Sequence, residues 1–469
     1  MSSSTVGTIY RSVAIRMVHL TCLMLSFASA ISAAPSMNKL VERANAGDYS
    51  APELYSPTYI RFDNGLQLVM LDREFARSVS FKVRVGVGMS DFECGTQEIP
   101  HALEHMVFGG LTDMPEAELE KRFWELGVSS NAYVAGSETV FEAAAFPSSL
   151  EETMALTRRM LTEGQFTEEQ WQKTSDILWQ EMGGEPTELE RSSSTAGELA
   201  SAGTKFLAEI DRQYHQVCPQ YDQQSDVELE DIQSAYDRYY QPQNMLWVVV
   251  GDIKEEEVRD WAKANLATLE NLGEVPDQKI APENWPEQRT WEGYSYDSSV
   301  GLYFKTPSIG HPDYFPLMAL KEWLDQRVYT ALRIGDGSAY SPMVDFWADE
   351  HHGQFAMATD TQPGSHSKAL ARLESLLRSV TDQSLSDQSF QRFMTGILRS
   401  WAQSPETNEG YADFYIASLW EFETRGRLIH YERELAAVTL SDVQRVARGL
   451  LESDSKYRFI NIEYPEDTL

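Results

Sequence analysis

The sequence predicts an α+β protein made of two similar halves. Strand-like and helix-like patterns are mixed within each half, which is typical of α+β folds. A polar stretch at 270–290, which contains three prolines and lacks helical periodicity, separates the halves as a linker. We therefore divide the chain into an N-terminal unit at 50–269 and a C-terminal unit at 291–469, each with a sheet packed by helices.

The first half opens with a hairpin signal. Asn64-Gly65 lies between two β-rich runs, Tyr59–Phe62 and Leu66–Leu71, and this dipeptide favours a tight turn between antiparallel strands. Further strands are expected at Val79–Val87, Asn131–Phe146 and Met245–Val250, and helices at His101–Phe108, Pro115–Leu126, Leu150–Leu161, Glu168–Met182 and Ile232–Tyr240.

Capping residues give the expected ends of two of these helices. Thr112 or Asp113 is expected to cap the helix at 115–126, and Gly127 to end it. Thr167 and Gln170 have the spacing of a capping box at the start of the helix at 168–182.

The second half repeats the plan more loosely. A hairpin is expected around the polar stretch at 349–353. The expected strands are Val300–Phe304, Met343–Ala348 and Gln354–Ala358, and the expected helices are Tyr314–Leu332, Lys368–Val380 and Ser386–Ser400.

Charge and composition exclude some functional classes. Lys and Arg total 39 against 72 Asp and Glu, a net charge of −33 over 469 residues. Nucleic-acid binding needs clustered cations, so this balance argues against it. The content of 42% hydrophobic and 11% aromatic residues is sufficient for a well-buried core.

The amino terminus, 1–34, resembles a secretory signal peptide. Arg11 and Arg16 precede a short apolar run at 17–27, and small residues follow up to Ala34. We expect secretion across the inner membrane, with the periplasm as destination; an uncleaved anchor is the alternative. Two further cysteines remain, Cys94 and Cys218, and they either pair in an oxidising compartment or stay as separate buried thiols.

The residues most indicative of chemistry lie together at 101–105. His101-Ala102-Leu103-Glu104-His105 spells H-x-x-E-H, and on a helix residues four apart share a face. Two imidazoles so placed can reach one metal ion, and a neighbouring carboxylate can take a proton from metal-activated water. The motif is the inverse of H-E-x-x-H.

A third metal ligand has to come from elsewhere in the chain. The candidate is Glu181, 76 residues after His105, in the apolar setting 177–180 of a predicted helix. Spacing alone leaves a solvated surface glutamate as an equal alternative.

The stretch 97–110 around this motif resembles the signature of the pitrilysin/insulinase metallopeptidases, the inverzincins. The resemblance implies a zinc ion held by His101, His105 and Glu181, with Glu104 as general base. It extends to 131–135 and 139–141, and to 239–252, which resembles the end of the family's first domain.

The resemblance also implies residues that bind substrate. An edge strand containing Asn131, Ala132, Tyr133 and Val134 would hold an extended peptide by main-chain hydrogen bonds. The segment 332–340 in the second half resembles the family's Arg…Tyr segment.

The resemblance implies that two polar side chains of this segment contact the substrate. Arg333 and Tyr340 keep the family's spacing of seven residues. They would contact the substrate near the carbonyl of the bond to be cut, where a cation and a phenol can stabilise developing negative charge.

The resemblance further implies an assembly of two chains. Four homologous units close a chamber in this family, and this chain has two, so it would form half of a clamshell. Since it carries both the H-x-x-E-H motif and the Arg/Tyr pair, a homodimer could complete both sites, and a heterodimer with a homologous subunit is the alternative.

Two positions depart from the family's pattern. Thr174 stands where the family often has a glutamate seven residues before the third ligand, and Asp176 or Glu185 are candidates to replace it. Pro100 directly precedes His101, which suits the first turn of a helix.

From the sequence we therefore expect a secreted zinc endopeptidase that hydrolyses peptides or unfolded segments. The alternative is a non-catalytic or weakly active partner subunit of a two-chain peptidase. A rival metal-like run at 349–352 falls in the expected hairpin turn and reads as a solvated loop.

Overall fold

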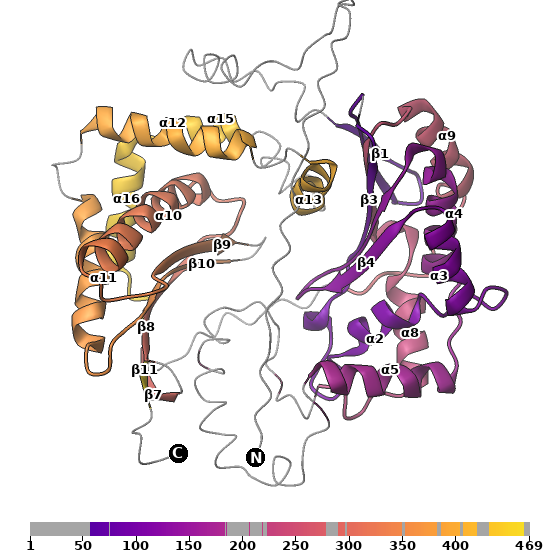
Figure 1. Cartoon of the computed structure of the whole chain (residues 1–469), viewed down its shortest axis with the longest axis horizontal. Coiled ribbons are helices and arrows are strands. Elements are labelled where there is room, and N and C mark those ends of the chain that lie inside the picture. The colour runs from indigo at the N-terminus through magenta and orange to yellow at the C-terminus, as the bar shows by residue number, and fades with distance from the viewer. Residues whose placement is uncertain are drawn as a thin grey trace, which may run out of the picture.

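The computed structural model describes residues 57–74, 76–182, 184, 206, 218, 223–277, 289–295, 298–348, 352–381, 386–403, 407–419 and 431–463. The signal-peptide prediction at 1–34 lies outside these residues. The described chain forms two sheets, each packed by its own helices on the outer side of the molecule (Figure 1). The expected α+β class with two sheet-and-helix units is confirmed.

The first sheet has six strands in the order β1-β2-β6-β3-β5-β4. The expected hairpin is confirmed, since β1 and β2 pair antiparallel and Gly65 adopts a φ of 88° in the turn. The central β6 is buried at every position, as its apolar sequence predicts. The strands are β1 (Thr58–Arg61), β2 (Gln67–Asp72), β3 (Val79–Val85), β4 (Ser129–Val134), β5 (Thr139–Ala145) and β6 (Met245–Gly251).

One face of this sheet is covered by helices of the first half. Their apolar residues form a single core with alternate residues of the strands, such as Phe81, Val83 and Trp247. The capping box of Thr167 and Gln170 is confirmed at the start of α5. The helices are α2 (Ile99–Met106), α3 (Glu116–Glu125), α4 (Leu150–Thr162), α5 (Glu168–Glu181), α8 (Leu229–Tyr239) and α9 (Glu255–Asn265).

The second sheet has five strands in the order β7-β11-β8-β10-β9, with a separate apolar core beneath it. The expected hairpin is confirmed by the antiparallel pairing of β9 with β10. The strands are β7 (Thr290–Ser295), β8 (Ser299–Thr306), β9 (Met343–Ala348), β10 (Gly353–Asp360) and β11 (Lys456–Glu463), and the helices are α10 (Tyr314–Val328), α11 (His366–Thr381), α12 (Asp387–Gln403), α13 (Asn408–Leu419), α15 (Tyr431–Ala436) and α16 (Leu440–Glu452).

Helix α13 belongs to the second half in sequence but packs on the first sheet. Its residues Tyr411, Ala412, Tyr415 and Ile416 form a core with the face of that sheet opposite the other helices. In Figure 1 this helix lies between the two halves. By its packing, this helix of the second half therefore belongs to the first sheet.

Several local predictions were wrong. The expected strand at 131–146 is two strands, β4 and β5, separated by a turn at 135–138, because Ala135 N donates to Glu138 O at 2.8 Å. Helix α3 begins after Pro115 and is not capped by Thr112 or Asp113. The helix expected at 314–332 ends as an α-helix at Val328 and continues as a π-helical stretch to Gly335.

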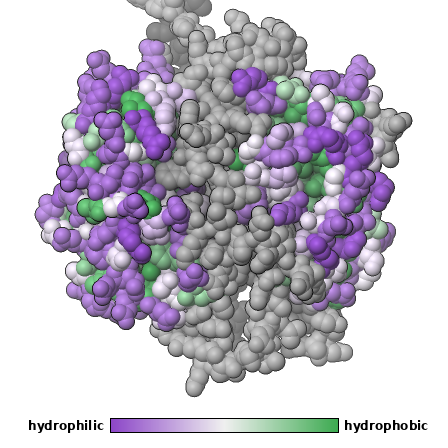
Figure 2. Space-filling view, turned by 180° about the vertical axis from the view of Figure 1, so that it is seen from behind, coloured by the Kyte–Doolittle hydropathy of each residue, from purple (hydrophilic) through white to green (hydrophobic). Residues whose placement is uncertain are grey.

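Other elements went unpredicted. These are the helices α9, α13, α15 and α16 and the strands β7 and β11. The described surface of both halves is mostly hydrophilic (Figure 2), in keeping with the strong net charge. Within the described residues, no helix has the length and apolar character needed to cross a membrane.

Candidate metal centre

Helix α2 carries three of the predicted site residues. Pro100 lies in its first turn, where a missing N–H has no cost. Its apolar residues Ile99, Ala102, Leu103 and Met106 are buried in the core of the first half. This burial fixes the rotation of the helix, so that His101, Glu104 and His105 lie on its partly exposed side.

The structure brings Glu181 to the two histidines. Glu181 is the last residue of α5, a helix that packs against α2. Its Oε2 lies 3.3 Å from His101 Nε2 and 3.7 Å from His105 Nε2. One ligand atom from each of the three residues lies within 4.8 Å of the other two. The three side chains that were proposed as ligands therefore converge from two helices.

These separations suit a tetrahedral zinc ion. Zinc bonds of about 2.0–2.1 Å at tetrahedral angles place neighbouring ligand atoms about 3.3 Å apart. Among the described residues the buried Nε2 of His105 has no hydrogen-bond partner, which is costly for a polar atom unless it binds a ligand. Two imidazoles and a carboxylate are also a donor set that zinc accepts at catalytic sites. The residues present therefore fit this ion.

Glu104 lies beside the converging atoms without joining them. Its Oε2 is 3.8 Å from the Nε2 atoms of both His101 and His105, and the side chain is 14% exposed. Burial raises the pKa of Glu104 above the usual carboxyl value, the two imidazoles oppose this, and the charge of Glu181 adds to it. A carboxylate in this place can reach a water bound between the histidines and take its proton.

A second glutamate contacts the far side of His101. Glu98 Oε2 lies 2.8 Å from His101 Nδ1, and Glu98 is buried. Burial lowers the pKa of His101, but the hydrogen bond with Glu98 and the charges of Glu98, Glu104 and Glu181 outweigh it and raise the pKa.

Glu98 was not predicted from the sequence. The signal that could have indicated it is a carboxylate three residues before His101, with Pro100 between them in the first helical turn. Of the two predicted candidates, Asp176 lies on α5 and Glu185 lies outside the described residues. Thr174 is buried on α5.

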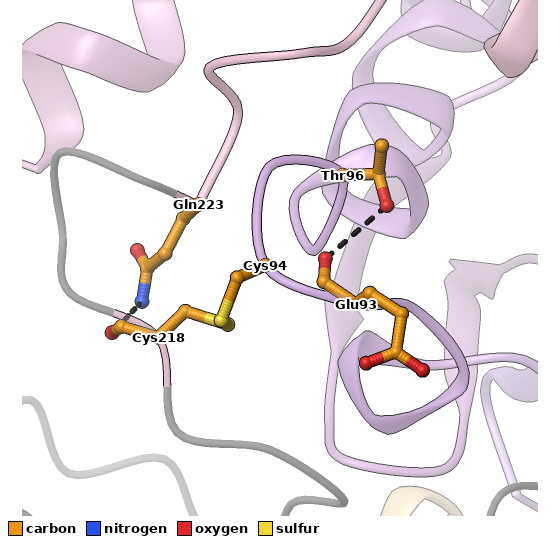
Figure 3. The surroundings of a disulfide bond; sticks show 5 residues. All are labelled: Glu93, Cys94, Thr96, Cys218 and Gln223. Carbon is orange, nitrogen blue, oxygen red and sulfur yellow. Dashed lines mark hydrogen bonds between the residues drawn. A yellow bond between two sulfur atoms is a disulfide. The ribbon is translucent and has the colours of Figure 1, made fainter.

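The loop in front of α2 is tied to a distant part of the chain. Cys94 and Cys218 form a disulfide across 124 residues of sequence (Figure 3). The sequence had left pairing and separate thiols open, and the structure shows the pair.

The proposed substrate strand, β4, is the last strand of the first sheet. Ala135 and Glu138 form a hydrogen-bonded pair at the end of this hairpin. Because hydrogen-bonded and non-hydrogen-bonded pairs alternate between antiparallel strands, Tyr133 and Asn131 are in hydrogen-bonded pairs with β5. Alternation then turns the N–H and C=O groups of Ala132 and Val134 away from β5. This strand also contacts α2, the helix that carries His101 and His105.

A pocket of about 280 Å³ lies along the other face of this strand. It is bounded by β3, β4, β5 and the start of α13, and its lining includes Lys82, Ser129, Asn131, Glu142 and Asn408. Lys82 is buried and pairs with Glu142 at 2.6 Å. The pocket is therefore polar and has room for a side chain.

Arg333 and Tyr340 contact each other in the second half. The Arg333 guanidinium lies 4.1 Å from the centre of the Tyr340 ring and donates to the Tyr340 carbonyl. Tyr340 is 73% exposed, and its backbone N–H donates to Asp360. No hydrogen bond or ion pair among the described residues joins either side chain to the histidine cluster of the same chain.

The rival metal-like run lies mostly outside the described residues, which exclude 349–351. Its last residue, His352, is buried and packs against Trp347 at a ring distance of 5.3 Å.

Comparison with known proteins places the chain in a family. A family model described as insulinase (peptidase family M16) matches residues 68–208, and a model described as the peptidase M16 inactive domain matches 226–396. The zinc protease PqqE of Helicobacter pylori is 21% identical over 410 residues, covering 83% of this chain and 88% of that protein.

Solved structures agree in fold. A protease from Helicobacter pylori superposes with a TM-score of 0.72 at 19% identity, covering 87% of this chain and 99% of that one. The periplasmic protease PqqL from Escherichia coli superposes at 0.68 and 16% identity, covering 87% of this chain but 47% of its own. Together with the two matched family models, these similarities show that the chain belongs to the pitrilysin/insulinase (M16) family of peptidases.

Proposed function

We propose that this protein is a secreted zinc endopeptidase in which His101, His105 and Glu181 hold the metal and Glu104 is the general base. The observation that carries the proposal is the convergence of two Nε2 atoms and one carboxylate oxygen, together with the burial of His105 Nε2 without a hydrogen-bond partner among the described residues. Relatives of the chain are named zinc proteases, which supports a peptidase function with this metal.

The chemistry proposed is hydrolysis of a peptide bond by water. Zinc, when bound, supplies a Lewis acid that polarises the carbonyl and lowers the pKa of water. Glu104 accepts a proton from the attacking water as the new C–O bond forms, and then passes it to the leaving nitrogen as the C–N bond breaks. Its partly buried position, next to both histidines, suits a carboxyl group that has to hold a proton between these steps.

The substrate proposed is an extended peptide or unfolded segment. The free backbone groups of Ala132 and Val134 can pair with such a peptide, and main-chain pairing tolerates many sequences. Side chains of an added strand alternate between the two faces, so some would point toward the pocket beside Asn131. Strands inside the sheets of a folded protein already have their backbone groups paired, so an unfolded segment is the better fit.

The assembly proposed has two chains, with Arg333 and Tyr340 of one chain serving the metal centre of the other. PqqL supports this, because this chain spans about half of that protease. A homodimer is sufficient because the chain carries both parts, and a heterodimer with a homologous subunit is the other arrangement. Export is supported by the segment 1–34 and by the disulfide, which suits an oxidising compartment.

Glu104→Gln in the purified protein tests the proposal. The variant should keep its zinc, measured by elemental analysis, and should cleave an unfolded polypeptide about 10²- to 10⁴-fold more slowly, as loss of a general base predicts. The same change at exposed Glu120, on α3, is the matched control and should leave cleavage unchanged.

Two results would contradict the proposal. Cleavage at the wild-type rate by Glu104→Gln would remove Glu104 from the mechanism. Wild-type protein that binds zinc but cleaves no unfolded polypeptide would instead favour the non-catalytic partner subunit.

A further inference from the structure

The buried carboxylate of Glu98 lies on the side of His101 that faces away from the other proposed ligands. Its Oε2 is 2.8 Å from His101 Nδ1, whereas Nε2 of the same ring is 3.3 Å from Glu181. A neutral imidazole has one donor nitrogen and one acceptor nitrogen, and a carboxylate requires the donor. Glu98 therefore selects the tautomer whose Nε2 lone pair faces Glu181 and His105.

We propose that Glu98 is a positioning residue of the metal centre, and that the disulfide-anchored loop 94–98 holds it against His101. This inference rests on the proposed zinc site. Glu98 is not itself a ligand in this arrangement, because it contacts the ring nitrogen that points away from the convergence.

The environment of Glu98 supports this role. The residue is 3% exposed, and within the described residues His101 is the only side chain that pairs with its carboxylate. A buried carboxylate without a partner is strongly unfavourable, so this contact fixes both side chains.

The loop that carries Glu98 is anchored at both ends. Cys94 is bonded to Cys218, and Glu98 N donates to Gln223 O at 3.0 Å (Figure 3 shows the disulfide). Between these points, Asp226 N donates to Gly95 O at 2.9 Å. The loop is thus tied to Cys218, Gln223 and Asp226.

Gly95 explains how the two segments come so close. Its φ is +91°, and a Cβ at this position would lie 2.6 Å from the Asp226 carboxylate. Only glycine adopts this conformation and allows this approach without strain. The anchoring contacts and the disulfide therefore act on the same short loop, which ends in the residue that orients His101.

The first test measures zinc affinity of the full chain by competition with a chromophoric chelator. Glu98→Ala should weaken zinc binding about 10- to 100-fold, as is typical for loss of a carboxylate behind a metal-ligating histidine. The zinc affinity of Glu98→Gln should lie between those of the wild type and Glu98→Ala, because an amide oxygen still accepts from Nδ1–H but carries no charge. Glu93→Gln, the same change on an exposed side chain of the same region, is the control and should bind zinc normally.

A spectroscopic readout separates orientation from mere stability. Cobalt-loaded Glu98→Ala should show altered visible absorption, while cobalt-loaded Glu98→Gln stays close to wild type. If Glu98→Ala does not fold, as judged by circular dichroism, the comparison of Glu98→Gln with Glu93→Gln decides the question. Zinc affinity of Glu98→Gln equal to that of the wild type would overturn the proposal.

The second test addresses the anchor. Replacing both Cys94 and Cys218 by serine should weaken zinc binding, and the loss should be smaller or absent when Glu98 is already alanine, because the disulfide acts through Glu98. Fully additive losses, or no loss from the cysteine changes, would overturn the role of the anchor.

Failure of the zinc site itself gives a different result. Wild-type protein that binds no zinc would contradict the proposed function. If the wild type binds zinc and folded Glu98→Ala binds it with the same affinity, only the inference about Glu98 is contradicted.

Discussion

At the scale of single residues, the candidate metal centre depends on one side chain that comes from a different helix from the rest. Glu181 ends α5 and is 46% exposed at its side chain, yet its Oε2 lies within 4 Å of the Nε2 atoms of His101 and His105. An exposed glutamate gains little from neutral imidazoles alone. Its position is therefore explained best by a shared cation.

Glu181→Ala tests this residue directly. Removal of one of three protein ligands should lower zinc content after dialysis well below one ion per chain, and the fold should stay intact because the side chain is partly exposed. Elemental analysis beside circular dichroism measures both. Glu169→Ala, an exposed glutamate at the start of the same helix, is the control. Full zinc retention in Glu181→Ala would exclude it as a ligand.

Through His101, the zinc affinity of the candidate metal centre should decrease as the pH falls. A histidine has to be neutral to bind zinc, and the surrounding carboxylates raise the pKa of His101 above its ordinary 6.5. As the pH falls, protons should begin to compete with zinc for His101 while the pH is still above 6.5. The apparent zinc affinity should therefore decrease with decreasing pH. Chelator competition at a series of pH values between about 8 and 5.5 measures this. An affinity independent of pH over that range would contradict the prediction.

At the scale of elements, the hairpin β4–β5 determines which backbone groups face a substrate. The sequence predicted one strand across 131–146, since its apolar pattern continues on both sides of the turn. The turn at 135–138 makes β4 an edge strand and leaves Ala132 and Val134 with free backbone groups.

Ala132→Pro removes one outward N–H from this strand. Proline is tolerated on an edge strand where the N–H does not bond the neighbouring strand, so the fold should persist. Loss of one backbone hydrogen bond to the peptide, worth about 1 kcal/mol, should lower kcat/KM about fivefold. Steady-state kinetics with thermal unfolding as a check measure this. Tyr133→Pro, which removes an inward N–H, should instead destabilise the protein, and unchanged kinetics in Ala132→Pro would exclude pairing at this residue.

At the scale of the whole molecule, no hydrogen bond or ion pair among the described residues joins the two parts of the proposed site within one chain. The Arg333–Tyr340 pair lies in the second half and the histidine cluster in the first. Helix α13, from the second half of the sequence, packs its apolar residues on the first sheet.

Mixing two inactive variants tests completion of the site between chains. In a mixed dimer, Glu104 of the Arg333→Ala chain faces the intact Arg333 of the Glu104→Gln chain, so one site is complete. The other site lacks both residues. Random mixing at equal amounts should restore about a quarter of wild-type activity, since half of the dimers are mixed and one of their two sites works. Glu104→Gln mixed with His101→Ala should stay inactive as the control. No activity from confirmed mixed dimers would contradict completion between chains.

The sequence by itself determined the features that depend on neighbours along the chain. The four-residue spacing of His101 and His105 and the apolar residues between them predicted one helix with both imidazoles on one side, because helical periodicity is local. The Asn64-Gly65 hairpin and the capping box at Thr167 were predicted for the same reason.

Only the tertiary structure decided which distant groups meet. Cys94 and Cys218 are 124 residues apart, and α13 crosses to a sheet formed more than 150 residues earlier in the chain, as Tyr411 packing with Leu246 shows. Glu181 had a candidate role from resemblance, but its distance to the imidazoles follows from how α5 packs on α2. Such contacts arise from burial of apolar faces against one another, and no spacing within a short stretch of sequence encodes them.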